Sequence, residues 1–381
     1  MISHATYQAA KFIAPLLNNY FEQYIIDAAG EDKKAHQVNS PSSEFIEALI
    51  DAAFWASLRK EEGNSPKISI AFLSPEQTTD PLLFGSRLRL TPRNLTKIAP
   101  GVEGSGIHLG VWFDETGLYI WGTTLNIPNY CFVLDVSEPA LLVVKHRRLC
   151  GFGKFTNVAI LKGDEIKVID ENSAFLPDSP QLLNYLLGLN TNTLQTESVN
   201  VLIQLAVSMR AHQKGGIILI VPTGSNTWHK SIVHPIQYLI DPVFTNLSKL
   251  VNEHSDIISE AFWESTVKKE IDNIAGLSAV DGAIILNDTY ELLAFGTKII
   301  KKSGAEQIDK LAFIEPIIGA EVKEIFPGEL GGTRHLSAAQ FIYDQRDATA
   351  LVASQDGHFT VFSWSPERNM VQSYRIDTLL I

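Results

Sequence analysis

The chain has 381 residues, of which 45% are apolar, and its 43 acidic and 31 basic residues give a net charge of −12. A chain of this length and composition can bury the cores of two domains, which excludes a disordered or collagen-like protein. The negative charge argues against a protein whose whole surface binds nucleic acid or an anionic membrane, so neither is expected as a partner.

Cysteine content and the first residues exclude further classes of protein. Cys131 and Cys150 are too few for a disulfide framework or a cysteine-based zinc site. The stretch from Met1 to His4 has no cationic segment followed by a long apolar core, so no signal peptide is expected. No run reaches the roughly 18 uninterrupted apolar residues of a membrane span. We therefore expect a soluble, cytoplasmic protein.

Residues 1–66 are predicted to form a helical segment. Ser40 and Pro41 are read as a helix cap followed by proline in the first turn. Breaker residues at 61–66 end this helix. Apolar residues recur between them at helical spacing, and they are Phe45, Ile46, Leu49, Ile50, Ala53, Phe54 and Leu58.

Residues 67–175 are predicted to form a β-rich domain, because short β-prone runs alternate there with turn residues. The predicted strands cover residues 68–72, 108–113, 118–122, 131–136, 141–146, 157–161 and 165–169. The largely polar, proline-containing stretch 172–180 is predicted to be a linker.

Residues 195–375 are predicted to form a second domain in which helices and strands alternate. A helix ends before Gly215 and Gly216, and the continuous apolar run 217–221 is typical of a strand covered on both faces. The alternation predicts a mixed β-sheet flanked by helices, so the fold class is α/β (α+β) with leading N-terminal helices. Later elements are a helix at 261–274, strands at 283–286 and 292–295, a helix from Thr333, and strands at 348–353 and 359–362.

The first candidate site lies at residues 280–286. Asp281 comes just before an apolar strand, which places a carboxylate at a sheet edge. Gly282 and Ala283 are small enough to let a bulky ligand approach the backbone. The alternative is a simple turn in which Asp281 bonds its own backbone.

The second candidate site lies at residues 331–339. Gly331 and Gly332 permit an unusual loop, and Thr333 is read as the cap of the helix that follows. A helix N-terminus with a nearby Arg334 is a natural anion site, because the helix dipole and the guanidinium act together. The alternative is a solvated pair of Arg334 and His335 with ordinary capping.

Other candidates are weaker. Residues 151–153 lack the third glycine and the helix of a dinucleotide-binding motif. His229 and His234 are five residues apart and not at the spacing of a helical zinc motif. The basic run 145–148 has few aromatic neighbours on which a nucleic-acid base could stack.

The order of Asp281-Gly282-Ala283 and Gly332-Thr333-Arg334-His335 before an alanine-containing helix resembles the diadenylate cyclase (DisA N-terminal-like) superfamily. The flanks agree, because residues 215–221 resemble the first core strand of that family and residues 348–354 resemble its closing strand. The resemblance covers about residues 197–375, roughly half the chain.

Within this superfamily the whole chain is most similar to the DACNV group of probable sensor domains. In that group a β-rich N-terminal part precedes a cyclase-like domain with an Arg-Ala-His…Gly-Gly segment. The corresponding residues here are 210–212, followed by Gly215 and Gly216.

The resemblance implies a chemistry and a set of site residues. In the cyclases two ATP-loaded domains meet, and each 3′-hydroxyl attacks the α-phosphate of the partner's ATP. By analogy Asp281 takes the carboxylate and metal role, and Mg²⁺ or Mn²⁺ is needed only when a nucleoside triphosphate is bound. The partner implied is an adenine nucleotide, and a homodimer through this domain is allowed. The residues given nucleotide or phosphate contacts are Gly282, Ala283, Gly332, Thr333, Arg334 and His335, with Asp281, Arg334 and His335 as catalytic residues.

The sequence also departs from the family. The Arg-His-Arg motif becomes Arg334-His335-Leu336, so a cation beside the phosphates is lost. An insertion at 301–326 could cover the face on which two active sites meet, and the acidic pair near the closing turn is replaced by residues 355–356. Losing one charge-assisted phosphate contact costs about 1.5–3 kcal/mol, which weakens turnover without abolishing binding.

We therefore expect a nucleotide-binding sensor protein whose cyclase-like domain binds ATP or an adenine-containing signal nucleotide. An active diadenylate cyclase that makes cyclic di-AMP from two ATP with a divalent metal is the alternative. A scaffold whose pocket has decayed is the third reading. Whether the chain is an enzyme stays open.

Overall fold

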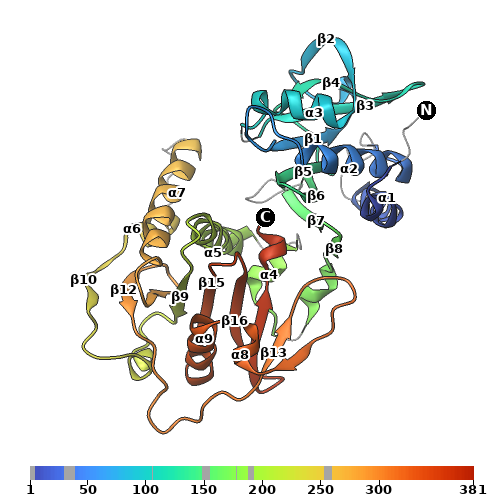
Figure 1. Ribbon diagram of the computed structural model, residues 1–381. Helices are drawn as coiled ribbons and strands as arrows, with labels where there is room; N and C mark the ends of the chain where they lie inside the picture. The colour runs from blue at the N-terminus through green and yellow to red at the C-terminus, as the bar shows by residue number, and fades with distance from the viewer. Residues whose placement is uncertain are drawn as a thin grey trace. The chain divides into compact units, whose positions relative to one another are not determined.

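The computed structural model describes residues 5–29, 39–104, 106–147, 155–176, 178–187, 193–252 and 260–381. The chain divides into two compact units, Met1–Ile169 with Ile381, and Asp170–Leu380. Each unit contains one mixed β-sheet and several helices, which confirms the mixed α/β class (Figure 1). The weak candidate at 151–153 and Cys150 lie outside the described residues.

The sheet of the first unit has the strand order β2-β4-β3-β1-β5-β6-β7-β8. Strands β1 and β3 are parallel, and the other neighbours are antiparallel. Seven of these strands were predicted, whereas β2 was not, because it is an exposed edge strand without apolar alternation. The strands are β1 (Ile68–Phe72), β2 (Leu82–Arg89), β3 (His108–Asp114), β4 (Gly117–Thr124), β5 (Phe132–Glu138), β6 (Leu141–Arg147), β7 (Phe155–Lys162) and β8 (Glu165–Val168).

Helices cover one face of this sheet. Helices α1 (Gln8–Ala29) and α2 (Ser43–Ser57) pack together, and their apolar faces join the strands in one core, to which α3 (Pro92–Ile98) adds Leu95. The predicted cap at Ser40 is wrong. Ser42 caps α2 instead, because its Oγ accepts a hydrogen bond from the N–H of Phe45 at 3.3 Å.

The sheet of the second unit has the strand order β10-β12-β11-β9-β15-β16-β17-β13-β14. The pairs β9–β11 and β13–β17 are parallel, and the others are antiparallel. The strands are β9 (Gly216–Val221), β10 (Tyr238–Phe244), β11 (Ala283–Asn287), β12 (Leu292–Thr297), β13 (Leu311–Ile314), β14 (Lys323–Ile325), β15 (Thr349–Ala353), β16 (Phe359–Ser365) and β17 (Met370–Arg375).

This second sheet lies between helices (Figure 1). Helix α9 contacts β9, β15, β16 and β17 and shares a core with alternate residues of β9, such as Ile217 and Leu219. Helices α5 and α7 pack together and contact β15 and β12, so they cover the side chains that alternate to the other face. The helices are α4 (Gln181–Leu186), α5 (Thr193–Ala211), α6 (Asn246–Asn252), α7 (Glu260–Leu277), α8 (Pro327–Leu330) and α9 (Thr333–Asp344).

The sequence analysis missed β10, β13, β14 and β17. Strand β10 is largely exposed, and β13 and β14 belong to the insertion at 301–326. That insertion extends the sheet beyond β17, so its two strands stand at the far end of the strand order from β10, β12 and β11. The predicted linker at 172–180 begins with a short 3-10 helix, η4 (Glu171–Phe175). Within the described residues, no helix is both long and apolar enough to span a membrane.

Candidate functional site

The two sequence motifs come together at one edge of the second sheet, the edge formed by the starts of β9 and β11 and the end of β15. Asp281 lies two residues before β11, and Gly215 lies just before β9, its parallel neighbour. Because β15 runs antiparallel to β9, its last residue, Ala353, reaches the same edge. A Cβ added to Gly215, whose φ is +70°, would lie 3.0 Å from Arg334 Nη1 and 3.1 Å from the Ala353 carbonyl oxygen. The side chain of Arg334, from the first turn of α9, therefore reaches the start of β9.

Asp281 is highly exposed, with 92% of its side chain accessible. Its carboxylate forms an ion pair and hydrogen bond with Lys298, which follows β12. The pKa of Asp281 is lowered, first by the Lys298 hydrogen bond and charge and also by the charge of Arg334. The carboxylate and the Arg334 guanidinium therefore lie within electrostatic reach of each other.

Gly282 and Ala283 are small for reasons of packing within the chain. Gly282 has φ +123°, and a Cβ there would lie 2.4 Å from the carbonyl carbon of Gly296. Gly296 in turn lies against the ring of Tyr238, and a Cβ there would be 2.8 Å from it. Ala283 is buried in the core. Strand packing thus accounts for both small residues without a ligand.

The N-terminus of α9 has no side-chain cap. Thr333 was predicted to be the cap, but the structure corrects this: Gly332 is the N-cap residue and Thr333 is the first helical residue. The N–H groups of His335 and Leu336 both bond to the Gly332 carbonyl, at 3.0 and 3.4 Å. The N–H groups of Thr333 and Arg334 have no intrahelical acceptor, and the helix dipole makes this end positive.

Arg334 supplies a cation at this helix end. The side chain is half-buried and makes no hydrogen bond or ion pair with any residue that the structure describes. A partly buried guanidinium beside unpaired backbone N–H groups can hold an oxyanion through two kinds of donor at once. Arg334 and the first turn of α9 therefore form the best candidate for a phosphate site in this unit.

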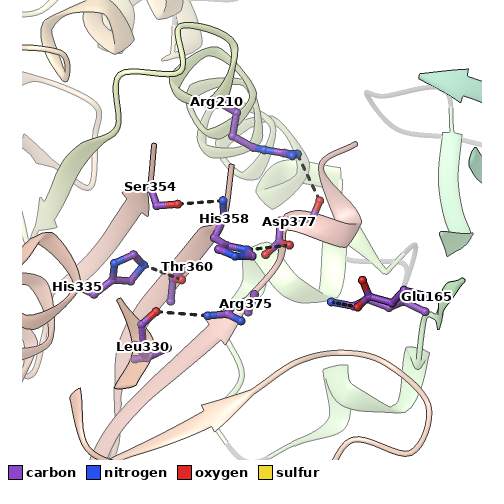
Figure 2. Close-up of polar contacts among 10 residues, drawn as sticks. Glu165, Arg210, Leu330, His335, Ser354, His358, Thr360, Arg375 and Asp377 are labelled. Carbon is purple, nitrogen blue, oxygen red and sulfur yellow. Dashed lines mark hydrogen bonds and ion pairs between the residues drawn. The ribbon is translucent and has the colours of Figure 1, made fainter. Parts of the chain in front are cut away.

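His335 lies inside the molecule rather than at the surface. It is 3% exposed, and its Nε2 lies 3.3 Å from Thr360 Oγ1 on β16 (Figure 2). Burial lowers its pKa to about 4, and the charges of Arg375, His358 and Arg334 add to this effect. The ring is thus neutral at pH 7 and packs between α9 and β16.

Two further residues lie close to His335 that the sequence analysis did not single out. Arg375, the last residue of β17, donates from Nη2 to the Leu330 carbonyl at 3.4 Å (Figure 2). His358 contacts the Asp377 carboxylate at 3.5 Å. Both stand outside the recognised motifs, and only the pairing of Thr360 with Arg375 between β16 and β17 brings them to this edge.

The segment 210–216 fixes the loop that carries Asp281. The Nδ1 atom of His212 accepts a hydrogen bond from the Lys214 N–H at 3.1 Å, so its Nε2 carries the proton donated to Ser278 Oγ at 2.9 Å. A Cβ on Gly216 would lie 2.6 Å from Ser278 Cβ. Ser278 lies three residues before Asp281, so these contacts tie the end of α7 to the start of β9.

A divalent metal fits this edge only in part. Within the described residues, no group of three or more His, Cys, Asp or Glu side chains is placed to hold a metal ion. Asp281 offers one carboxylate, and Lys298 already occupies it. Nucleotide-bound Mg²⁺ needs only one or two carboxylates, because phosphates and water supply the other ligands. Asp281 would therefore hold a metal only together with bound phosphates and after Lys298 moves away.

Comparison with known protein families gives a match over part of the chain. Residues 35–125 match the model of a family described as probable sensor domain DACNV. The matched stretch holds α2, α3 and β1 to β4 of the first unit and includes neither of the two motifs at the sheet edge. No curated protein matches the chain. The match supports a similarity of residues 35–125 to the DACNV probable sensor domains.

Proposed function

We propose that this chain is a nucleotide sensor whose second unit binds the phosphates of an adenine nucleotide at the edge formed by Asp281, Gly215 and Arg334. The observation that carries the proposal is the Arg334 guanidinium, which lies at an uncapped helix N-terminus without a partner in the described structure. Two donors of this kind suit an oxyanion such as a phosphate group. The adenine part comes from the resemblance to diadenylate cyclases.

The aromatic pair beside Gly296 supports a base-binding role. The rings of Tyr238 and Phe295 are stacked with centroids 4.7 Å apart, and Tyr238 is 39% exposed. The Tyr238 ring also lies against Gly296, which lies against Gly282. A partly exposed aromatic ring next to the Asp281 loop offers a surface on which a purine can stack.

Three features favour sensing over synthesis. The Asp281 carboxylate, expected to bind metal, is paired with Lys298, and it belongs to no group of three or more metal-ligating side chains among the described residues. Leu336, at the position of the lost cation, is 37% exposed and adds no charge. Cyclase activity remains the rival, and its test is incubation with ATP and Mg²⁺ or Mn²⁺ followed by mass spectrometry. Cyclic dinucleotide that disappears in Asp281→Asn would establish synthesis instead.

Calorimetric titration with ATP tests the binding proposal. The substitution Arg334→Gln removes one charged donor, which is worth about 1.5–3 kcal/mol, so affinity is expected to fall about 10- to 100-fold. Arg368→Gln is the matched control, because Arg368 is exposed in the turn at the other end of β16. Undiminished affinity in Arg334→Gln, or an equal loss in Arg368→Gln, would refute the proposed site.

A further inference from the structure

A cavity of about 270 Å³ lies in the second unit where β9 and β11 end, at the opposite ends of these strands from Arg334. Strand β9 leads from Gly216 at the first edge to Val221 at the second, so a strand of six residues separates the two places by roughly 20 Å. The walls come from the loop after β9, the β11–β12 turn and the edge strand β10. They are Pro222, Thr223, Gly224, Ser225, Asn226, Trp228, His229, Leu239, Ile240, Val243, Asn287, Glu291 and Leu293.

Hydrogen bonds hold these walls in place. The Thr223 N–H donates to the Asp288 carboxylate at 2.9 Å, and the Asp288 N–H donates to the Val221 carbonyl at 2.9 Å. The Trp228 indole N–H donates to the Ser225 carbonyl at 3.0 Å, and its side chain is buried. The loop after β9 is therefore tied to both the turn and the core, so the cavity is formed before any ligand arrives.

Glu291 is the one formally charged side chain among the described residues that line the cavity. Buried Asn287 positions it, donating from Nδ2 to Glu291 Oε2 at 2.6 Å and accepting from the Glu291 N–H at 2.8 Å. The Oε1 atom of Glu291 has no hydrogen-bond partner within the described chain. One carboxylate oxygen thus remains available to a ligand donor.

His229 does not neutralise this carboxylate. Its ring stacks on Trp228 with centroids 3.8 Å apart. Burial lowers its pKa, and the charge of His234 lowers it further, so the ring is neutral at pH 7. No lysine or arginine lines the cavity among the described residues, and the Asp288 carboxylate lies close behind Thr223. The local charge is therefore negative, the reverse of the Arg334 edge.

The remaining walls are apolar. Leu239 and Val243 of β10 face the cavity from one side, and Leu293 of β12 and the buried Trp228 face it from others. We propose that this cavity binds a small amine, with the ammonium group paired to Glu291 and an apolar body against β10 and Trp228. An anionic nucleotide is the wrong ligand for it, so the proposal does not depend on the function assigned to the first edge.

The test uses three probes of equal size on the full chain: benzylamine, benzyl alcohol and benzoate. The indole N–H signal of Trp228, assigned through Trp228→Phe, is followed by NMR during titration. Benzylamine is expected to shift this signal to saturation, benzyl alcohol to bind at least fivefold more weakly, and benzoate to leave the signal unchanged. Failure of benzylamine to move the signal, or equal binding of benzoate, would overturn the proposal.

Two variants and a control locate the effect. Glu291→Gln keeps an acceptor for Asn287 but removes the charge, so benzylamine should bind about tenfold more weakly while benzyl alcohol binds as before. Glu321→Gln is the control, because Glu321 is exposed between β13 and β14 at the far end of the sheet. Val243→Trp should fill the cavity and abolish both shifts. Unchanged benzylamine affinity in either Glu291→Gln or Val243→Trp would rule the site out.

Discussion

Arg334 and His335 are adjacent in the first turn of α9 but have opposite environments. Arg334 is half-buried beside Gly215 without a partner in the described structure, whereas His335 is buried against Thr360 with a pKa of about 4. A helix sends successive side chains in directions about 100° apart, so neighbours in one motif need not share a role. The anion-binding role fits Arg334, and the packing role fits His335.

The buried, neutral His335 predicts a specific dependence of stability on pH. Its pKa falls from 6.5 to about 4 on folding, so the unfolded chain binds more protons between these values. The stabilisation from neutral His335 is complete above pH 6.5 and is lost as pH falls towards 4, on the order of 3 kcal/mol in total. Denaturant unfolding of wild type and His335→Gln at pH 7, 5.5 and 4 measures it. The difference in free energy of unfolding between wild type and variant should shrink or reverse on acidification. A difference that stays constant with pH would contradict the low pKa of His335.

At the scale of elements, the site depends on how closely the N-terminus of α9 approaches the start of β9. Gly215 permits this approach, because its φ of +70° is unfavourable for other residues and a side chain would meet Arg334. The hydrogen bond between His212 and Ser278 fixes the loop that carries Asp281. The geometry of the candidate site is therefore set by the junction of three elements rather than by either motif alone.

This junction predicts a separable effect of Gly215→Ala. The left-handed backbone should cost about 1–2 kcal/mol of folding stability, and the added methyl at 3.0 Å should displace Arg334 and weaken ATP binding about tenfold. Gly304→Ala is the matched control, because Gly304 has φ +78° and open space around its Cα. Denaturant unfolding should show similar losses in both variants, and calorimetry should show weaker ATP binding only in Gly215→Ala. Equal ATP affinity in the two variants would refute the proposed role of Gly215 in placing Arg334.

At the scale of the whole molecule, each of the two units has a large hydrophobic core of its own. The first gathers α1, α2 and the first sheet around residues such as Leu49, and the second gathers α9 and the second sheet around residues such as Phe341. Among the residues that the structure describes, these two clusters share none. The family match lies in the first unit, and the candidate site around Arg334 lies in the second.

Separate cores predict two unfolding transitions in the full chain. Leu49→Ala should lower the free energy of unfolding for only one of them, by about 2–5 kcal/mol. Phe341→Ala should lower that of only the other, by about 3–5 kcal/mol. Both side chains are fully buried, which makes the two substitutions comparable. Differential scanning calorimetry provides the measurement. A single transition that both variants shift would mean that the cores unfold together.

The sequence by itself determined the elements whose apolar pattern is local. The continuous run of β9, the short β-prone runs of β3 to β7 and the apolar stripe of α2 are predicted with small errors at their ends. Their apolar residues stand close together in the sequence, so each element can be recognised without its neighbours. It also brought out Asp281 and Arg334 as residues of interest. Exposed edge strands such as β2 and β10 carry no such period and were missed.

Only the tertiary structure decided what depends on contacts between distant segments. Strand pairing brings Arg375 to His335, and packing rather than a ligand accounts for Gly282. The ion pair of Lys298 with Asp281 and the cavity beside Glu291 likewise join residues from separate elements. Hydrophobic periodicity reports whether a side chain is buried, but it carries no information about which side chain lies opposite, and site chemistry depends on that neighbour.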